Sequence, residues 1–144
     1  MTRLFNSGQR TLTTSRTYNE PMYKFLDTSA WPSVDRVREF WEGWFSLYDD
    51  AKKPGLAARF QSYDNHPHLS AFLELFTFVV LRRAGCQVEV EPSVGKWALE
   101  FLARMNQRDL QFYCECTATG QRAEEASADA LEADILDAID NVPT

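Results

Sequence analysis

The sequence predicts an α/β domain in which a long apolar helix is followed by three short strands and a closing helix. Apolar residues recur at helical spacing in segments 34–48, 69–84 and 122–140, and they alternate with polar residues in three runs between 87 and 117. With 44% hydrophobic and 25% charged residues among 144, the chain can bury one core and is not globally disordered. We expect residues 31–144 to form this single domain, with its core at 66–140, and residues 1–30 to be irregular.

Two helices are predicted before the strands. The first is an extra N-terminal helix that follows Trp31 and extends to Tyr48, and Lys53-Pro54-Gly55 is expected to end this region before a connector or short helix. The second covers Leu69–Ala84 and leaves almost no polar face, which predicts burial on most sides. Gly85 is placed to terminate it.

The three predicted strands are joined by short polar connectors, which favour an antiparallel meander. They cover Gln87–Glu91, Trp97–Arg104 and Leu110–Thr117. Alternation places Glu100 on one face of the second strand and Glu115 on one face of the third, each opposite to the bulky apolar residues. A last helix over Arg122–Asp140 follows, and no strand comes after it. We therefore expect that the last core strand is missing, or that a second copy completes the open sheet edge in a homodimer.

The net charge of −6 is unevenly distributed along the chain. Residues 1–60 carry +2, residues 61–117 carry −2 and residues 118–144 carry −6, so a local basic surface for DNA or RNA remains open. The longest apolar run, at 71–81, is interrupted by Glu74 and is too short to span a bilayer, so no membrane partner is expected. No apolar stretch follows Arg3 and three cysteines cannot all pair, which together predict a cytoplasmic protein.

Three glutamates are the candidate site. Glu74 is a carboxylate on a nearly all-apolar helix, where burial is costly unless the group is paired. From spacing alone it could face a solvent window, bond to a neighbouring side chain, or join a site. If the strands of Glu100 and Glu115 are neighbours, their carboxylates repel, and a divalent cation such as Mg²⁺ or Mn²⁺ would relieve the conflict. A pair of solvent-facing strand glutamates is the other interpretation left open.

The segments around these glutamates resemble the PD-(D/E)XK nuclease superfamily. The likeness rests on residues 68–75, 81–90, Leu99-Glu100-Phe101-Leu102 and Phe112-Tyr113-Cys114-Glu115-Cys116-Thr117. The N-terminal segments 8–16 and 20–26 are similar to a bacterial subfamily with a degenerate motif. The resemblance implies a restriction-endonuclease-like α-β-β-β-α core, with a mixed sheet flanked by helices, and metal-dependent cleavage of phosphodiester bonds.

By position, the resemblance makes Glu74, Glu100, Glu115 and Thr117 the catalytic set, with Glu100 and Glu115 as ligands for Mg²⁺ or Mn²⁺. Thr117 stands where the superfamily has a lysine, so no cation lies beside the attacking water. Lys96 and Arg104 are each four residues from Glu100, about 13 Å along a strand, which is too far for a convincing replacement.

The sequence thus predicts a divergent metal-dependent nuclease-like domain that acts on DNA or RNA. Two alternatives remain. The first is a catalytically inactive module of the same fold that binds nucleic acid or protein. The second is an assembly domain completed by a partner strand.

Overall fold

The computed structural model describes residues 1–119 and 123–140. Within them lie five α-helices, a three-stranded sheet and a two-stranded hairpin, which bears out the α/β class. The elements are α1 (Met22–Thr28), α2 (Pro32–Ser46), α3 (Lys53–Phe60), α4 (Asn65–Arg83), β1 (Gln87–Val90), β2 (Ser93–Val94), β3 (Trp97–Ala98), β4 (Phe101–Met105), β5 (Leu110–Cys114) and α5 (Ala123–Asp140).

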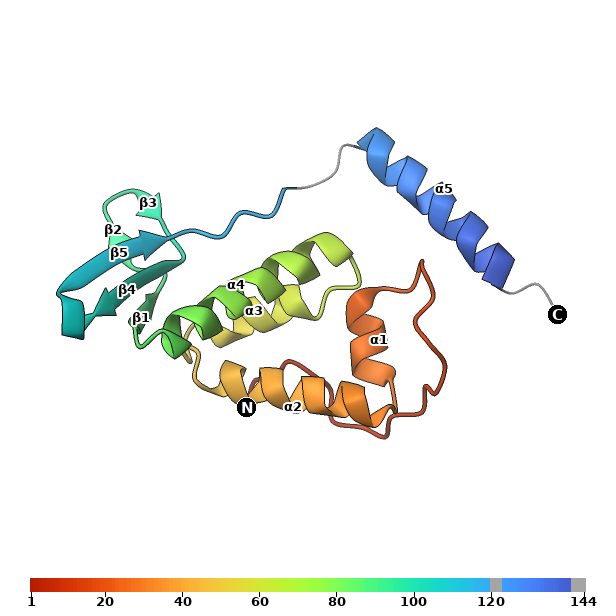
Figure 1. The fold of residues 1–144 in the computed structure, drawn as a ribbon, viewed down its shortest axis with the longest axis horizontal. Coiled ribbons are helices and arrows are strands. Elements are labelled where there is room, and N and C mark those ends of the chain that lie inside the picture. The colour runs from red at the N-terminus through yellow and green to blue at the C-terminus, as the bar shows by residue number, and fades with distance from the viewer. Residues whose placement is uncertain (120–122, 141–144) are drawn as a thin grey trace.

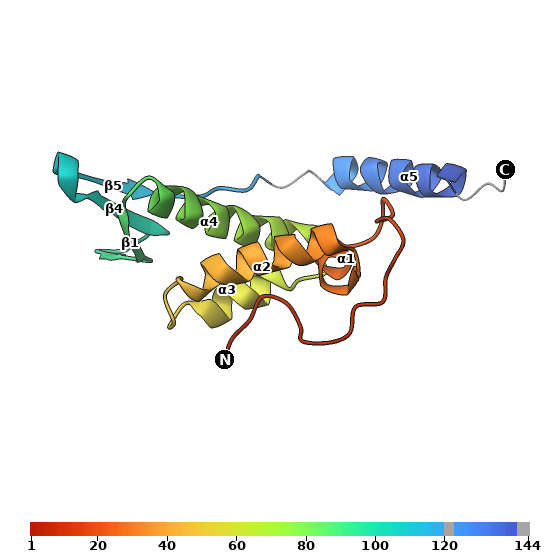
Figure 2. The same ribbon diagram turned by 60° about the horizontal axis from the view of Figure 1, so that its bottom comes forward.

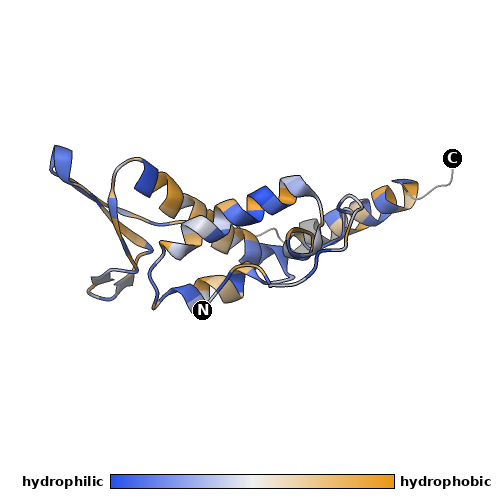
Figure 3. Cartoon of the chain, turned by 90° about the horizontal axis from the view of Figure 1, so that it is seen from below, coloured by the Kyte–Doolittle hydropathy of each residue, from blue (hydrophilic) through white to orange (hydrophobic). Residues whose placement is uncertain are grey.

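Helix α4 is the centre of the fold. It lies between the layer of α2 and α3 and the sheet, which stands at one end of the molecule (Figures 1 and 2). Leu75 is fully buried, and Phe78 reaches Phe101 of β4 with 6.3 Å between ring centroids. Figure 3 shows the apolar residues of α4 as an orange stretch near the sheet. The burial on most sides that was predicted for this helix is confirmed on the face that meets α3 and the sheet. It is wrong for another face, where Phe76 and Val80 are 47% and 48% exposed.

Local interactions explain where helix α4 begins and where it ends. The Asp64 carboxylate accepts a hydrogen bond from the backbone N–H of His66 at 3.0 Å, so it caps the first turn, slightly before the predicted start. Gly85 has a φ of +86°, a conformation that glycine adopts without strain, and it ends the helix as predicted. His68 is buried, and its Nδ1–H donates to the carbonyl of Phe60 at 2.5 Å.

The main sheet is antiparallel throughout, in the order β1-β4-β5. The antiparallel meander is therefore confirmed, whereas the mixed sheet is wrong for the strands described. The single strand expected over Trp97–Arg104 is also wrong, because β3 pairs with β2 in a separate hairpin. The chain bends at Glu100, whose carbonyl accepts from the N–H of Glu91 at 2.6 Å, and only then enters β4.

The N-terminal segment is more ordered than its composition suggested. Residues 22–28 form α1, and Leu4 and Phe5 belong to the buried core. The buried carboxylate of Asp27 accepts from the backbone and side-chain amides of Asn6, at 2.9 and 2.8 Å. The expectation of an irregular segment over 1–30 is therefore wrong for α1. Likewise, Lys53-Pro54-Gly55 begins α3 instead of ending the helical region.

Helix α5 stands apart from the α2–α4 layer (Figures 1 and 2). Asp137 accepts from the backbone N–H of Tyr18 at 2.9 Å, and Asp134 accepts from the side-chain amide of Asn19. The predicted last helix is thus observed from Ala123, while Arg122 lies outside the described residues. None of the helices described here is long and apolar enough to cross a membrane.

Candidate functional site

Glu74 is buried and fully engaged. Its side chain is 6% exposed, and it forms an ion pair with Arg59 of α3 at 2.7 Å. The hydroxyl of Tyr48, just beyond α2, donates to its other carboxylate oxygen at 2.5 Å. Three helical segments therefore meet at this carboxylate. Of the explanations open from the sequence, bonding to neighbouring side chains is what the structure shows.

Tyr48 acts only as a donor in this arrangement. Burial raises the pKa of its hydroxyl well above the ordinary range, and the hydrogen bond to Glu74 raises it further. The phenol therefore stays neutral at any ordinary pH, and its O–H group remains a hydrogen-bond donor to the Glu74 carboxylate. This donor and the Arg59 guanidinium together offset the cost of burying the charge of Glu74.

Glu100 and Glu115 lie opposite each other at one end of the sheet. Phe101 pairs with Cys114 at the last position of the β4–β5 ladder. The next residues outward are Glu100, directly before β4, and Glu115, directly after β5. Both were predicted inside strands, and both in fact flank them. The backbone N–H of Cys116 donates to the Glu100 carboxylate, so the two chain segments stay joined beyond the last pair of the β4–β5 ladder.

The charges of the three glutamates act on one another. Burial is the largest cause that raises the pKa of Glu100, and the charges of Glu74 and Glu115 raise it further. The N–H of Cys116 and the guanidinium of Arg59 work in the opposite direction. Four side chains from α3, α4 and the two strand ends therefore share one electrostatic environment, centred on Glu100.

Thr117 is exposed and lies three residues beyond the end of β5. Its segment is attached to α4 through the preceding cysteine, because the thiol of Cys116 donates to the hydroxyl of Thr77 at 3.2 Å. Thr77 follows Glu74 by one helical turn. Thr77 of α4 is consequently joined to the segment that follows Glu115.

Arg59 is the cation of this cluster, and sequence reasoning missed it. Of the two candidates considered, Arg104 reaches Glu89 at 3.3 Å, and Lys96 lies 5.6 Å from the ring centroid of Trp97. Arg59 sits in a short helix that no sequence motif marked, fifteen residues before its partner. The only sequence signal for it was the need of a buried Glu74 for a partner.

The donor set suits a hard divalent cation in part. Within residues 1–119 and 123–140, no group of three or more His, Cys, Asp or Glu side chains gathers closely enough to hold a metal ion. Mg²⁺ is nevertheless often bound through one or two carboxylates, with water completing the shell. Glu100 and Glu115 match that requirement in chemistry, whereas Glu74 has each of its oxygens engaged within the protein.

The larger hollows of the surface lie elsewhere. Two of them adjoin the N-terminal segment and α2, and both are bordered by Arg3 and Glu42. Neither includes a residue of the glutamate cluster. Within the cluster Glu74 is buried, Glu100 is half-buried and Glu115 is exposed, so the cluster reaches solvent at the strand ends.

Comparison with known proteins adds no relative to this description. No family model, curated protein or solved structure matches the chain.

Proposed function

We propose that this chain is a divergent, metal-dependent nuclease-like domain that acts on the phosphodiester bonds of nucleic acid. The observation that carries the proposal is the placement of Glu100 and Glu115, which flank the last β4–β5 pair, Phe101 and Cys114, so that both carboxylates belong to one end of the sheet. Carboxylates crowded in this way favour a divalent cation, because the cation removes their mutual repulsion. The likeness of these segments to the PD-(D/E)XK superfamily points to the same chemistry.

Each residue has a role in this proposal. Glu100 and Glu115 would hold Mg²⁺ or Mn²⁺, and such an ion supplies a Lewis acid and a more acidic bound water. Arg59 is anchored by Glu74 and is 42% exposed, so its remaining N–H groups could bind a phosphate oxygen. Glu74 and Tyr48 would orient that guanidinium. Thr117 would hydrogen-bond water without supplying charge.

A catalytically inactive module of the same fold is the second candidate. The observation that favours it is the engagement of Glu74, because Tyr48 and Arg59 already use both of its carboxylate oxygens. Thr117 strengthens this alternative, since it provides no cation near Glu115. Such a module would bind nucleic acid or protein and would leave phosphodiester bonds intact.

The deciding experiment is a cleavage assay with purified full chain. Single- and double-stranded DNA and RNA are incubated with Mg²⁺, with Mn²⁺ or with a chelator. We expect cutting that requires the metal and that is lost in Glu115→Ala. The matched control is Glu89→Ala, which removes an exposed glutamate of β1 that pairs only with Arg104 in the contacts described. This control should cut as the parent chain does.

Two outcomes contradict the nuclease proposal. Cutting that survives Glu115→Ala or the chelator would belong to another site or to a contaminant. Binding of nucleic acid with no cutting under any metal would favour the inactive module. Titration of Mn²⁺ alone into parent chain and Glu115→Ala then tests metal binding separately from catalysis.

A further inference from the structure

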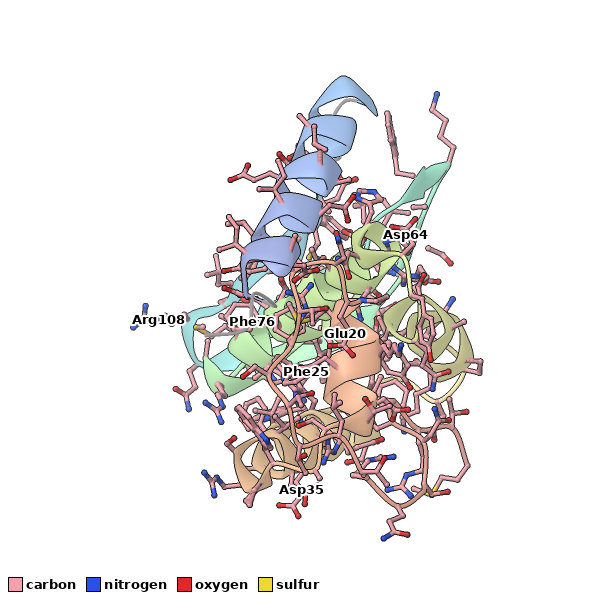
Figure 4. The ribbon with its side chains drawn as sticks, turned by 90° about the vertical axis from the view of Figure 1, so that its right-hand side faces the viewer. Glu20, Phe25, Asp35, Asp64, Phe76 and Arg108 are labelled. Carbon is pink, nitrogen blue, oxygen red and sulfur yellow. The ribbon has the colours of Figure 1, made fainter. Side chains whose placement is uncertain are left out.

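Helices α2 and α4 expose a continuous apolar surface, which we call the α2–α4 patch. Its members are Val37, Phe40, Phe72, Phe76 and Val80, and four of them are 39–48% exposed. The residues are linked by ring contacts, since Phe40 meets Trp41, Trp41 meets Phe72 and Phe72 stacks on Phe76. Figure 4 labels Phe76 on the side of α4 away from α3. Large apolar side chains gathered on one face are typical of an interaction surface.

Helix α5 carries a second uncovered apolar surface, the α5 stripe. It consists of Leu131, Ile135 and Ile139, which are 61%, 52% and 60% exposed. The side of α5 that is partly covered is a different one, formed by Ala133, Leu136 and Asp137. The stripe therefore points away from the contacts that hold α5 to its own chain.

The two surfaces match in geometry. Phe72, Phe76 and Val80 follow one another at four-residue intervals along α4. The α5 stripe has the same interval. Each row spans about 12 Å of helix at a rise of about 1.5 Å per residue. Rows with one repeat interdigitate when two helices pack side by side.

Their charges are also complementary. Arg83 lies over the rings of Phe40 and Trp44, at 5.4 and 5.3 Å, and Arg36 precedes Phe40 by one helical turn. The patch is thus bordered by arginines. Residues 128–140 of α5 contain five acidic residues and no lysine or arginine, and Glu132 lies beside the stripe. Acidic α5 and the arginine-bordered patch would attract each other before any apolar contact forms.

We propose that the α5 stripe of one copy packs on the α2–α4 patch of a second copy, and that the exchange is reciprocal. The occupant of the patch is therefore α5 of a second identical chain. In its own chain α5 stands apart from α2 and α4, with its stripe uncovered (Figure 1). Reciprocal exchange buries the patch and the stripe of both copies in one closed, two-fold assembly, as isologous dimers require. This dimer differs from one formed by pairing open sheet edges.

The test measures the mass of the full chain by sedimentation equilibrium across the micromolar range. We expect a dimer whose dissociation constant rises at least about tenfold in Phe76→Glu and in Ile135→Glu. Both positions are about half exposed, so both variants should keep the circular-dichroism spectrum of the parent. The matched control is Leu110→Glu, at an apolar residue of β5 that is 48% exposed and lies outside both surfaces. It should leave the dissociation constant unchanged.

Mixing the two variants identifies the partner. The Phe76→Glu chain keeps an intact stripe and the Ile135→Glu chain keeps an intact patch. The mixture should therefore form a heterodimer that is tighter than the homodimer of either variant. A monomeric parent chain would overturn the proposal. So would an Ile135→Glu dimer of parental strength, because it would mean that patches meet each other. A mixture that associates no more tightly than either variant alone would mean that α5 does not occupy the patch of a second chain, which also overturns the proposal.

Discussion

The ion pair between Arg59 and Glu74 predicts which of two substitutions, one at each residue, destabilises the fold more. The Glu74 side chain is 6% exposed and that of Arg59 is 42% exposed. Removing the arginine leaves a buried carboxylate with one partner, Tyr48. Removing the charge of the glutamate leaves an arginine that water already reaches. Arg59→Ala should therefore destabilise the fold more than Glu74→Gln.

The magnitudes follow from burial. Truncating one partner of a buried pair typically costs about 3–5 kcal/mol. For Arg59→Ala we expect about 2–3 kcal/mol, because Tyr48 still donates and water can enter the space that the guanidinium leaves. For Glu74→Gln we expect about 1 kcal/mol, because the amide oxygen still accepts from Tyr48. In the double variant no charge is buried, so it should be more stable than Arg59→Ala alone.

Urea denaturation followed by tryptophan fluorescence and circular dichroism measures these differences. The matched control is Arg104→Ala, whose side chain is 43% exposed but whose partner Glu89 is 49% exposed. It should cost at most about 0.5 kcal/mol, as exposed pairs do. If Glu74→Gln proves more damaging than Arg59→Ala, or if the two changes are additive, the burial argument is refuted.

Three further predictions concern single groups. Tyr48→Phe removes a donor to a buried charge and should cost about 2 kcal/mol in the same urea assay; no loss would mean that the hydroxyl is not bonded to Glu74. Burial, followed by neighbouring charges, raises the pKa of Glu100, so its ionisation opposes folding as the pH rises above 4.5. Glu100→Gln should therefore be more stable than the parent chain at pH 7 and of similar stability at about pH 3. Burial lowers the pKa of His68, although its bond to the Phe60 carbonyl partly opposes this, so stability should fall as the pH drops below 6.5. His68→Asn should flatten that pH dependence, and an unchanged slope would assign it to another group.

The sequence predicted that Glu74, Glu100 and Glu115 lie near one another, but it predicted neither the partners Arg59 and Tyr48 nor the geometry. Alternation correctly assigned Glu100 and Glu115 to matching positions, because the register that pairs Phe101 with Cys114 brings them opposite each other. Their location at strand ends was not foreseen. The β2–β3 hairpin diverts the chain before Glu100, and that diversion depends on pairing between β2 and β3.

Tertiary contacts also overrode local composition at the N-terminus. Leu4 and Phe5 stand in a polar stretch that suggested an irregular segment, yet both are buried. Phe5 stacks on Tyr23 and meets Phe60 edge to face. Apolar residues so sparse carry no periodic signal, and their burial depends on partners far along the chain.

Residue order by itself determined the α4 helix, its glycine stop, the antiparallel meander and the three glutamates as the candidate site. These features depend on periodicity, turn chemistry and neighbours within a few positions. Only the tertiary structure decided that Glu74 is held by Arg59 and Tyr48, residues fifteen and twenty-six positions away. It alone decided that the α2–α4 patch and the α5 stripe stay uncovered within one chain. Burial and ion pairing across such separations arise from packing, which no local pattern of residues encodes.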